Sequence, residues 1–368
     1  MTKEKKFKKR KLWQKIIICL LLIILIIVLG FSALIGYLTL TEFNPDKEVP
    51  LKLTGKSQTE AVYKSKELTA VSWNIGYGAL GSDADFFMDG GKSVDTADKD
   101  GVNKNLKGIS SELNSLNPDF ILLQEVDTDA KRSSYINEAS KLQSELLNQD
   151  YQSSFAENFK VKFIPYPIPP IGKVNAGIMT LSKSKISEAT RVQLPCPFKW
   201  PTRIANLKRC LSINRLPIEG SDKELVIVNL HLEAYDDGDG KKAQAEMLRK
   251  YLQAEADKGN YVIAGGDFNQ TFSGTDTSII KQFNGTWKPP VLDTDKFDKS
   301  WQFLMDTKTA SCRSLDKPLT SLNTNKFQFY IIDGFIVSSN IEVTSIETKQ
   351  IGFKNTDHNP VVLKFKLK

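Results

Sequence analysis

An uncharged apolar segment near the N-terminus constrains this chain more than any other feature of the sequence. Residues 16–40 contain no Asp, Glu, Lys or Arg and consist mostly of Ile and Leu. As a helix they would extend about 37 Å, enough to cross the roughly 30 Å hydrocarbon core of a bilayer. The segment is longer than the apolar region of a signal peptide and lacks a clear small-residue cleavage site. We therefore predict an uncleaved transmembrane anchor.

The charges on either side of this anchor predict its orientation. Residues 1–15 carry eight Lys and Arg against one acidic residue, Glu4. Under the positive-inside rule this basic tail stays in the cytoplasm, and the chain from residue 41 onward lies outside. These residues account for the net charge of +7, so the rest of the chain is formally neutral. This neutral charge argues against a protein that binds long nucleic acids mainly through phosphate contacts, although it leaves open a local basic patch on the domain.

The remaining sequence predicts a spacer followed by one folded domain. Residues 41–67 are polar, contain two prolines and show no sustained period, which indicates a juxtamembrane spacer. In residues 68–368, apolar strand-like runs alternate with amphipathic helical segments, which is typical of an α/β domain. Helices are expected over 102–116, 135–148 and 241–258. Strands are expected over 68–78, 120–127, 175–183, 211–218, 225–234, 261–263, 327–339 and 361–367, with the third to fifth as antiparallel neighbours.

Polar side chains suited to catalysis lie where these predicted strands end. Asp267 and Asn269 follow an apolar run through paired glycines, a pattern that is also ordinary turn material. The two histidines of the chain, His231 and His358, occupy similar positions. The full set is Asn74, Glu125, His231, Asp267, Asn269, Asp333 in the middle of its strand, Asp357 and His358. Oxygen-rich groups with no cysteine among them suit Mg²⁺ or Mn²⁺ better than a structural zinc.

Three features each leave two interpretations open. The apolar, proline-rich segment 163–172 is either a packed connecting loop or a loop that touches membrane or lipid. Cys196 and Cys210 either form a disulfide or remain buried free thiols. In the segment that they bracket, Arg203 and Arg209 are either substrate contacts or solvated surface charges.

Two glycosylation sequons bear on the source of the protein. They begin at Asn269 and Asn284. A glycan on Asn269 would block the predicted site, so an exported enzyme with this sequence suits an organism that lacks the modification. We expect a single-pass protein of a bacterial plasma membrane.

Six segments in order resemble one known superfamily. They are WNIGYG, LLQEVD, VNLHLEA, GGDFNQ, IIDGFIVS and TDHNPVV. Together they resemble the endonuclease/exonuclease/phosphatase superfamily, which includes enzymes similar to deoxyribonuclease I and to neutral sphingomyelinases. The resemblance covers residues 68–368 and implies a four-layer α-β-β-α sandwich of two mixed, mainly antiparallel sheets.

The resemblance also implies a role for each residue at a matching position. It implies that Glu125 is the principal metal ligand, assisted by Asn74 and Asp357, and that the metal is Mg²⁺ or Mn²⁺. It implies that Asp267 orients or deprotonates the attacking water and that Asn269 stabilises the pentacovalent phosphate. It further implies that His358, oriented by Asp333, contacts the phosphoryl group or acts as general base. By the same resemblance, His231 is an acid or a phosphate ligand. Asn175 stands where relatives often carry a phosphate-contacting side chain. Whether Asp267 or His358 takes the proton stays open.

These observations favour one function over two alternatives. The favoured function is a membrane-anchored, extracytoplasmic, Mg²⁺-dependent phosphoesterase whose substrate is a lipid headgroup or another small phosphoester. The first alternative is a surface nuclease of the same mechanism, with nucleic acid as substrate. The second is a non-catalytic binding module that retains the fold. The sequence indicates no protein partner.

Overall fold

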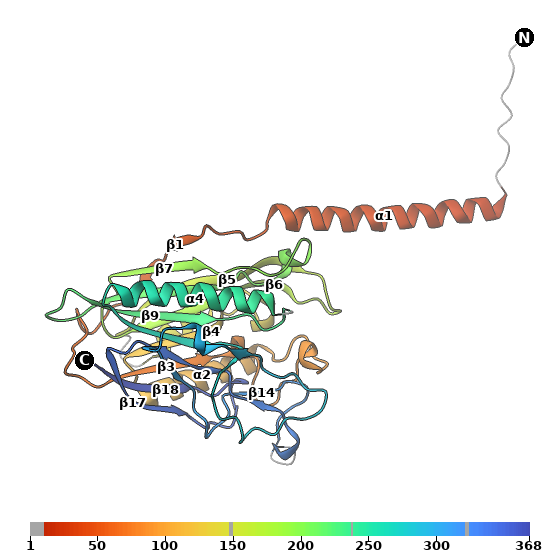
Figure 1. The fold of residues 1–368 in the computed structure, drawn as a ribbon. Helices are drawn as coiled ribbons and strands as arrows, with labels where there is room; N and C mark the ends of the chain where they lie inside the picture. The colour runs from red at the N-terminus through yellow and green to blue at the C-terminus, as the bar shows by residue number, and fades with distance from the viewer. Residues whose placement is uncertain (1–10, 147–149, 237, 321–323) are drawn as a thin grey trace, which may run out of the picture. The chain divides into compact units, whose positions relative to one another are not determined.

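Two units make up the chain in this computed structural model, which describes residues 11–146, 150–236, 238–320 and 324–368. The first unit extends to Glu42 and contains the helix α1 (Leu12–Leu40) (Figure 1). Its apolar side chains are exposed along most of its length. This helix contains the predicted 16–40 segment and is long and apolar enough to cross a membrane. Residues 1–10 of the predicted basic tail lie outside the described residues.

Two large mixed sheets form the frame of the second unit, Phe43–Lys368. Sheet I has the order β1 (Glu48–Pro50), β7 (Glu188–Gln193), β8 (Cys210–Pro217), β9 (Glu224–His231), β10 (Tyr261–Asp267), β16 (Asp333–Val337) and β13 (Gln302–Leu304). Sheet II has the order β17 (Ile341–Thr348), β18 (Val361–Leu367), β3 (Leu68–Asn74), β4 (Phe120–Asp127), β6 (Gly172–Ser182), β5 (Gln152–Ile164) and β2 (Leu53–Thr54). The neighbouring pairs β3–β4 and β9–β10 are parallel, and the other pairs within the two sheets are antiparallel.

Short elements connect the main strands. The two small strand pairs are β11 (Thr271–Phe272) with β12 (Val291–Leu292) and β14 (Cys312–Arg313) with β15 (Phe329–Tyr330). The short 3-10 helices are η1 (Gly76–Gly78), η2 (Phe87–Asp89), η3 (Lys131–Ser133), η5 (Thr202–Ala205), η6 (Thr294–Lys296) and η7 (Thr324–Lys326).

Helices cover the outer faces of the two sheets. Sheet II is covered by α2 (Lys99–Leu116) and α3 (Glu138–Glu145), and sheet I by α4 (Asp239–Asp257) (Figure 1). At the start of α2, the side chain of Asp98 accepts a hydrogen bond from the backbone N–H of Gly101 at 2.8 Å and so caps the helix. The arrangement is the predicted four-layer α-β-β-α sandwich, which is confirmed.

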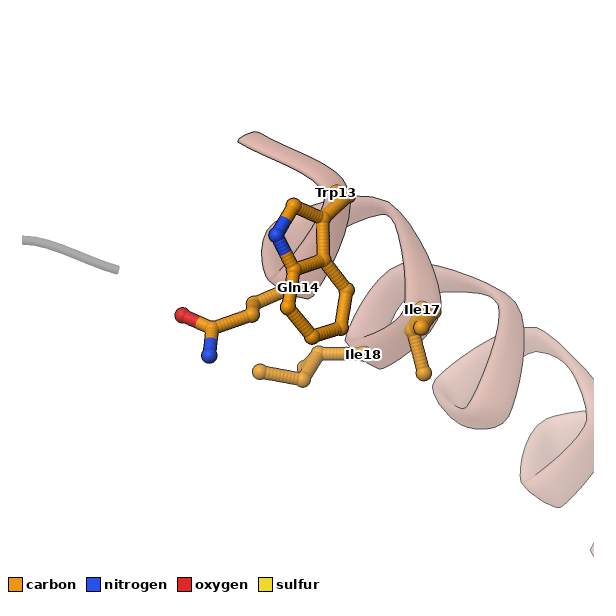
Figure 2. Close-up of a pocket in the computed structure, with 4 residues that line it drawn as sticks. All are labelled: Trp13, Gln14, Ile17 and Ile18. Atoms are coloured by element: carbon orange, nitrogen blue, oxygen red, sulfur yellow. The ribbon is translucent and has the colours of Figure 1, made fainter. Parts of the chain in front are cut away.

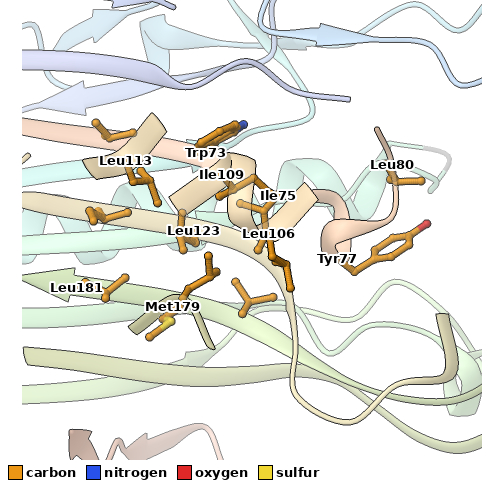
Figure 3. Close-up of a cluster of buried hydrophobic side chains, with 14 of the residues drawn as sticks. Trp73, Ile75, Tyr77, Leu80, Leu106, Ile109, Leu113, Leu123, Met179 and Leu181 are labelled. Carbon is orange, nitrogen blue, oxygen red and sulfur yellow. The ribbon is translucent and has the colours of Figure 1, made fainter. Parts of the chain in front are cut away.

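The alternation of side chains explains why the central strands are apolar at nearly every position. In β4, Phe120 and Leu122 point toward sheet I, while Leu123 packs against α2. Figure 3 shows Leu123 beside Ile109 of α2 in this outer cluster. A strand covered on both faces needs an apolar residue at each position, so its sequence loses the simple alternation of a half-exposed strand.

Segment 41–67 differs from the expected spacer. The folded unit begins at Phe43, and β1 and β2 within this segment add a strand to each sheet. These strands are two and three residues long, too short to produce a visible period in the sequence.

Three other expectations also differ from the structure. The three strands expected as antiparallel neighbours divide between the sheets: β8 and β9 pair in sheet I, whereas β6 lies in sheet II. Asp333 is the first residue of β16 and not the middle of a strand. The helix expected over 135–148 is shorter, and its predicted end at residue 148 lies outside the described residues.

Cys19, Cys196, Cys210 and Cys312 are free thiols, so the structure contains no Cys196–Cys210 disulfide.

Candidate active site

Strand directions bring the predicted catalytic residues to one edge of the sandwich, called here the catalytic edge. The carboxyl ends of the parallel pairs β3–β4 and β9–β10 lie there. β16 and β18 run antiparallel to β10 and β3, so their starts lie at the same edge. A hydrogen bond from Asn74 to Asp267 joins the two sheets at this point. The residues delivered to the edge are Asn74, Glu125, His231, Asp267, Asn269, Asp333, Asp357 and His358.

A β-bulge in β4 aims Glu125 at the catalytic edge. The pairing of β4 with β6 shifts register between Leu123 and Val126, and Glu125 has a left-handed φ of 54°. Without the bulge, Glu125 would continue the face of Leu123, which packs against α2. Asn269 also has a positive φ, of 50°. Strained backbone of this kind concentrates at functional sites, where the surrounding fold must hold it.

Asn74 bridges two carboxylates. Its Nδ2 donates to Oε1 of Glu125 and to Oδ2 of Asp267, both at 3.1 Å, while its Oδ1 accepts from the backbone N–H of Gly76 at 3.0 Å. Gly76 has a φ of 51°, and a Cβ there would lie 2.9 Å from Oδ1 of Asp357, so this close approach requires glycine. Asn74 turns its amide nitrogen toward the carboxylates, and its role as a direct metal ligand stays a prediction.

Asp267 lies at the centre of the site. Its Oδ1 accepts from the backbone N–H of Asn269 at 2.8 Å, and its Oδ2 lies 3.3 Å from Nε2 of His231 and 3.8 Å from Nε2 of His358. Burial raises the pKa of Asp267 to about 7; the charge of Asp333 adds to this effect and that of His358 opposes it. A carboxylate with a pKa near neutrality is a stronger base than an ordinary aspartate.

His358 forms a buried pair with Asp333. Its Nδ1 lies 2.9 Å from Oδ2 of Asp333, and its backbone carbonyl accepts a hydrogen bond from Nε1 of Trp73 at 2.9 Å. The backbone N–H of Asp333 donates to Oγ of Ser311 at 3.1 Å. Burial alone would lower the pKa of His358, but the charges around it, that of Asp333 foremost, together with its hydrogen bond to Asp333, outweigh burial and raise the pKa well above its ordinary value. His358 therefore carries a positive charge and presents Nε2 to Asp267.

The surroundings of His231, unlike those of His358, disfavour a positive charge on the imidazole. Burial, followed by the positive charges of Arg209 and His358, holds the pKa of His231 well below its ordinary value, so this imidazole is neutral. Nη1 of Arg209 donates to the backbone carbonyl of His231 at 3.2 Å, and its Nε donates to Glu233 at 3.2 Å. Nδ1 of His231 has no hydrogen-bond partner among the described residues. Arg209 is thus buried in an internal ion pair that holds the end of β9.

The two remaining predicted substrate contacts lie on other elements. Asn175 is on β6, and its backbone carbonyl accepts from the N–H of Thr128 at 2.8 Å, just beyond the bulge in β4. Within the described part of the chain, its buried Oδ1 has no hydrogen-bond partner. Arg203 is exposed on η5. Their roles toward a substrate stay predictions.

A comparison with protein families agrees with this geometry. A model of the Endonuclease/Exonuclease/phosphatase family matches residues 71–317. The chain belongs to this family. Its members are hydrolases that act on phosphoesters and typically depend on a divalent metal. The matched range ends before Asp333 and His358, which the fold nevertheless brings beside Asp267, and before Asp357, whose Oδ2 lies 4.0 Å from Nε2 of His358.

Solved structures of the endonuclease/exonuclease/phosphatase family share the fold at low sequence identity. One from Beutenbergia cavernae is 16% identical, with a TM-score of 0.58 over 82% of this chain and 72% of that chain. The human nocturnin catalytic domain, with bound sulfate anion, is 17% identical, with a TM-score of 0.51 over 86% of this chain and 98% of that chain. ANGEL2, described as a 2',3'-cyclic phosphatase, is 13% identical, with a TM-score of 0.53 over 87% of this chain and 98% of that chain. A comparison with curated proteins found no match.

The donor atoms at the catalytic edge fit the divalent metal on which members of the family typically depend. Among the described residues, ligating atoms lie within 4.8 Å of one another in the group Asp267, Asp333 and His358 and in the group Cys312, Asp357 and His358. Because His358 and Cys312 keep their protons, the carboxylates of these groups are the ligands available to a metal. Burial raises the pKa of Asp357, and the charge of Glu125 raises it further, against the opposing charge of His358. Carboxylates that repel one another in a buried site favour a bound hard cation.

Cys312 is a member of the site that the sequence analysis missed. The candidate residues predicted from the sequence include no cysteine, whereas Cys312 forms an isolated β-bridge with His358 and lies beside Asp357. Burial raises the pKa of its thiol to about 12, so the sulfur stays protonated. The surrounding sequence SCRSLD carries no recognisable signal, since only the fold brings it to His358.

A second missed group lies beside Glu125. Arg132 donates to both carboxylate oxygens of Asp127, at 3.1 and 2.9 Å, and its guanidinium lies 3.8 Å from the centre of the Tyr77 ring. Its charge contributes to the low pKa of His231. The available signal was Asp127 itself, because a carboxylate at the end of a buried strand needs a cationic partner.

Proposed function

We propose that this chain is a membrane-anchored, extracytoplasmic, Mg²⁺-dependent phosphoesterase that hydrolyses a lipid headgroup or another small phosphoester. One observation carries the proposal: Oδ2 of Asp267 lies 3.3 Å from Nε2 of His231 and 3.8 Å from Nε2 of His358, and the first imidazole is neutral whereas the second is positively charged. Hydrolysis of a phosphoester needs a base for the attacking water and positive charge near the phosphoryl oxygens. Both are present within one buried cluster.

The residues of this cluster divide the reaction between them. Asp267 accepts a proton from the attacking water as the water oxygen bonds to phosphorus and the bond to the leaving oxygen breaks. His358, kept positive by its 2.9 Å contact with Asp333, stabilises the negative charge that grows on the phosphoryl oxygens. Neutral His231 positions Asp267 from the other side. We place the proton on Asp267 rather than on His358 because Asp333 already holds His358 in its charged form.

Glu125 and Asp357, with Asn74 beside them, are the residues proposed to hold Mg²⁺. The metal would supply charge neutralisation for the phosphate group when bound. Support comes from the anionic character of the group: Glu125 raises the pKa of Asp357, and Asn74 Nδ2 is 3.1 Å from Glu125. Mn²⁺ would satisfy the same oxygen donors.

The anchor part of the proposal draws its support from α1. Its apolar side chains are exposed, and aromatic residues mark both ends, Trp13 and Tyr37. Figure 2 shows Trp13 with Gln14, Ile17 and Ile18 lining a pocket at the first turns of the helix. Twenty-four residues of helix span about 36 Å, which places the two aromatic rings near opposite interfaces of a bilayer.

Phosphorus NMR tests the proposed activity. The full chain in detergent micelles would be incubated with Mg²⁺, phospholipids, short DNA and sugar phosphates. We expect one lipid or small phosphoester signal to disappear, and a chelator or Asp267→Asn to prevent the loss. Asp276→Asn is the matched control, because Asp276 is an exposed aspartate outside the site.

Each other outcome of this experiment points elsewhere. Loss of the DNA signal alone would support the surface nuclease. An unchanged spectrum in every arm would support a binding module that retains the fold. Equal turnover by Asp267→Asn and the unaltered chain would contradict the assignment of the base.

A further inference from the structure

The hairpin formed by β5 and β6 ends in an exposed apolar tip. Tyr166 is 72% exposed and Ile168 is 94% exposed, and Phe163 beside them is also exposed. These three residues are called the apolar tip below. Each of Tyr166 and Ile168 is followed by a proline, which fixes φ and limits the conformations that the tip can adopt. Large apolar side chains exposed together on an ordered element mark a binding surface.

The base of the hairpin is well packed, so the exposure of the tip is a property of the fold. Phe159, Val161, Ile164 and Val174 belong to a buried cluster that holds the two strands together. Nζ of Lys131 donates to the backbone carbonyl of Pro170 at 3.2 Å. The tip is therefore held in place from both strands.

A neighbouring loop adds an exposed aromatic ring and positive charges. Ala205 and Leu207 pack against the cluster at the base of the hairpin, and Trp200 in the same loop is 56% exposed. Exposed basic residues lie close to these apolar side chains in the sequence: Lys162 precedes Phe163, and Lys199 and Arg203 lie on either side of Trp200. Aromatic and aliphatic side chains bordered by Lys and Arg are typical of surfaces that enter the interface of an anionic bilayer.

Strand register places the apolar tip on the side of the catalytic edge. The last pairs at the end of β4 are Asp127 with Ala176 and, across β6, Ala176 with Phe159. Beyond this level β5 continues to Ile164, paired with Gly172 of β6. The hairpin thus extends about 15 Å past the end of β4, in the direction in which Glu125 is delivered.

The folded unit begins beside the same hairpin. The centre of the Phe43 ring lies 5.7 Å from Nζ of Lys160 on β5 and 5.6 Å from Cζ of Arg191 on β7. Leu40 is the last residue of α1, and the chain from Leu40 to Phe43 spans at most about 11 Å. If α1 crosses a bilayer, Lys160 and the hairpin beyond it stay close to the membrane surface.

We propose that the apolar tip and Trp200 insert into the interface of the bilayer that α1 spans, so that the catalytic edge faces that bilayer. The inference rests on the membrane anchoring in the proposed function and deepens it, because it makes the substrate a phosphoester at the surface of the same membrane. We propose a lipid bilayer, and not a protein, as the binding partner of the apolar tip, because the covalent tether and the basic residues both favour a bilayer.

Photo-cross-linking tests the insertion without depending on activity. The full chain would carry a benzophenone amino acid at position 168 and be reconstituted into phosphatidylcholine vesicles with phosphatidylglycerol. The control carries the same group at Tyr63, which is 46% exposed and lies beside Val62 at the opposite edge of the sandwich. We expect lipid adducts at position 168 and few at position 63. Equal lipid labelling at both positions, or protein adducts alone at position 168, would overturn the proposal.

Turnover in the same vesicles tests the consequence for catalysis. Tyr166→Ser and Ile168→Ser should each lower hydrolysis of a phosphodiester lipid in the vesicle by about tenfold or more, because each removes apolar area that anchors the edge to the bilayer. Hydrolysis of bis-p-nitrophenyl phosphate, a soluble ester, should not change, and Tyr63→Ser should change neither. Equal losses on both substrates would refute the orientation.

The two experiments separate failure of this inference from failure of the proposed function. Lipid adducts at position 168 from a chain that hydrolyses no phosphoester would retain the insertion and reject the enzyme. Turnover of lipid that the tip variants leave unchanged would retain the enzyme and reject the insertion.

Discussion

An ion pair far from the catalytic edge offers a quantitative test of the fold. Arg215 on β8 donates to both carboxylate oxygens of Glu255 on α4, at 2.9 and 2.6 Å, and Nδ2 of Asn260 donates to Glu255 at 2.8 Å. Burial alone would raise the pKa of Glu255, but the hydrogen bonds from Arg215, Lys258 and Asn260 outweigh it and lower the pKa to about 2. The pair ties the last turns of α4 to sheet I.

The change Glu255→Gln removes the charge from this pair. The gap between the ordinary pKa of 4.5 and the folded pKa of about 2 corresponds to about 3 kcal/mol. The Arg215 side chain is 22% exposed, and solvent screening reduces the expected contribution to about 2 kcal/mol. Because the folded pKa lies below the unfolded one, this stability is present above about pH 4.5 and is lost as the pH falls toward 2.

Urea unfolding of the full chain in detergent, followed by tryptophan fluorescence, measures this contribution. At about pH 6, Glu255→Gln should lower the free energy of unfolding by about 2 kcal/mol, and at about pH 3 the difference should be less than half as large. Glu246→Gln is the matched control on the same helix. The pKa of Glu246 is also lowered to about 2, but its exposed pair with Arg249 is screened by solvent and should contribute nothing measurable. An equal difference at both pH values for Glu255→Gln, or equal losses for the two variants, would refute the reasoning.

Three further predictions concern the catalytic edge. Asp333→Asn removes the charge that raises the pKa of His358. Turnover should therefore fall about 10²- to 10⁴-fold, and the alkaline limb of the pH profile of turnover should move to lower pH. An alkaline limb that does not move would exclude His358 as the group that titrates there. Gly266→Ala places a Cβ 2.0 Å from the carbonyl oxygen of Leu230 and should destabilise the protein by at least about 2 kcal/mol in thermal unfolding, whereas an unchanged melting temperature would contradict this contact. Glu125→Gln should raise the Mg²⁺ concentration for half-maximal turnover by about tenfold or more, and full turnover at low Mg²⁺ would reject Glu125 as a ligand.

Much of the catalytic edge could be predicted from the sequence because strand ends leave a local signal. The change from apolar to polar residues marks Asn74, His231 and Asp267, and each lies at the end of its strand. Parallel pairing then brings such ends together without further information. Asp333 was predicted as a site residue but misplaced along its strand, since Phe329 and Tyr330 form the separate strand β15, and residues 331–332 between β15 and β16 belong to no strand.

The direction in which a side chain points, and its contacts with segments far away in the chain, could not be predicted in the same way. The bulge that turns Glu125 out of the face of Leu123 depends on a left-handed φ that its sequence does not require. Cys312 reaches His358 only through a bridge between segments far apart in the chain. The strands β1 and β2 exist because β7 and β5 offer edges to pair with, not because their own residues favour them.

The two histidines show most clearly what tertiary structure adds to the sequence. Both follow the same local rule, an imidazole at a strand end beside polar residues, and the sequence left open which groups near Asp267 carry the proton. Asp333, 25 residues before His358, makes that imidazole positive; Arg209, 22 residues before His231, helps to keep the other neutral. Asp267 therefore lies between a fixed cation and a neutral ring. Its proposed role as the base therefore rests on how the strands pair and not on the motif in which it lies.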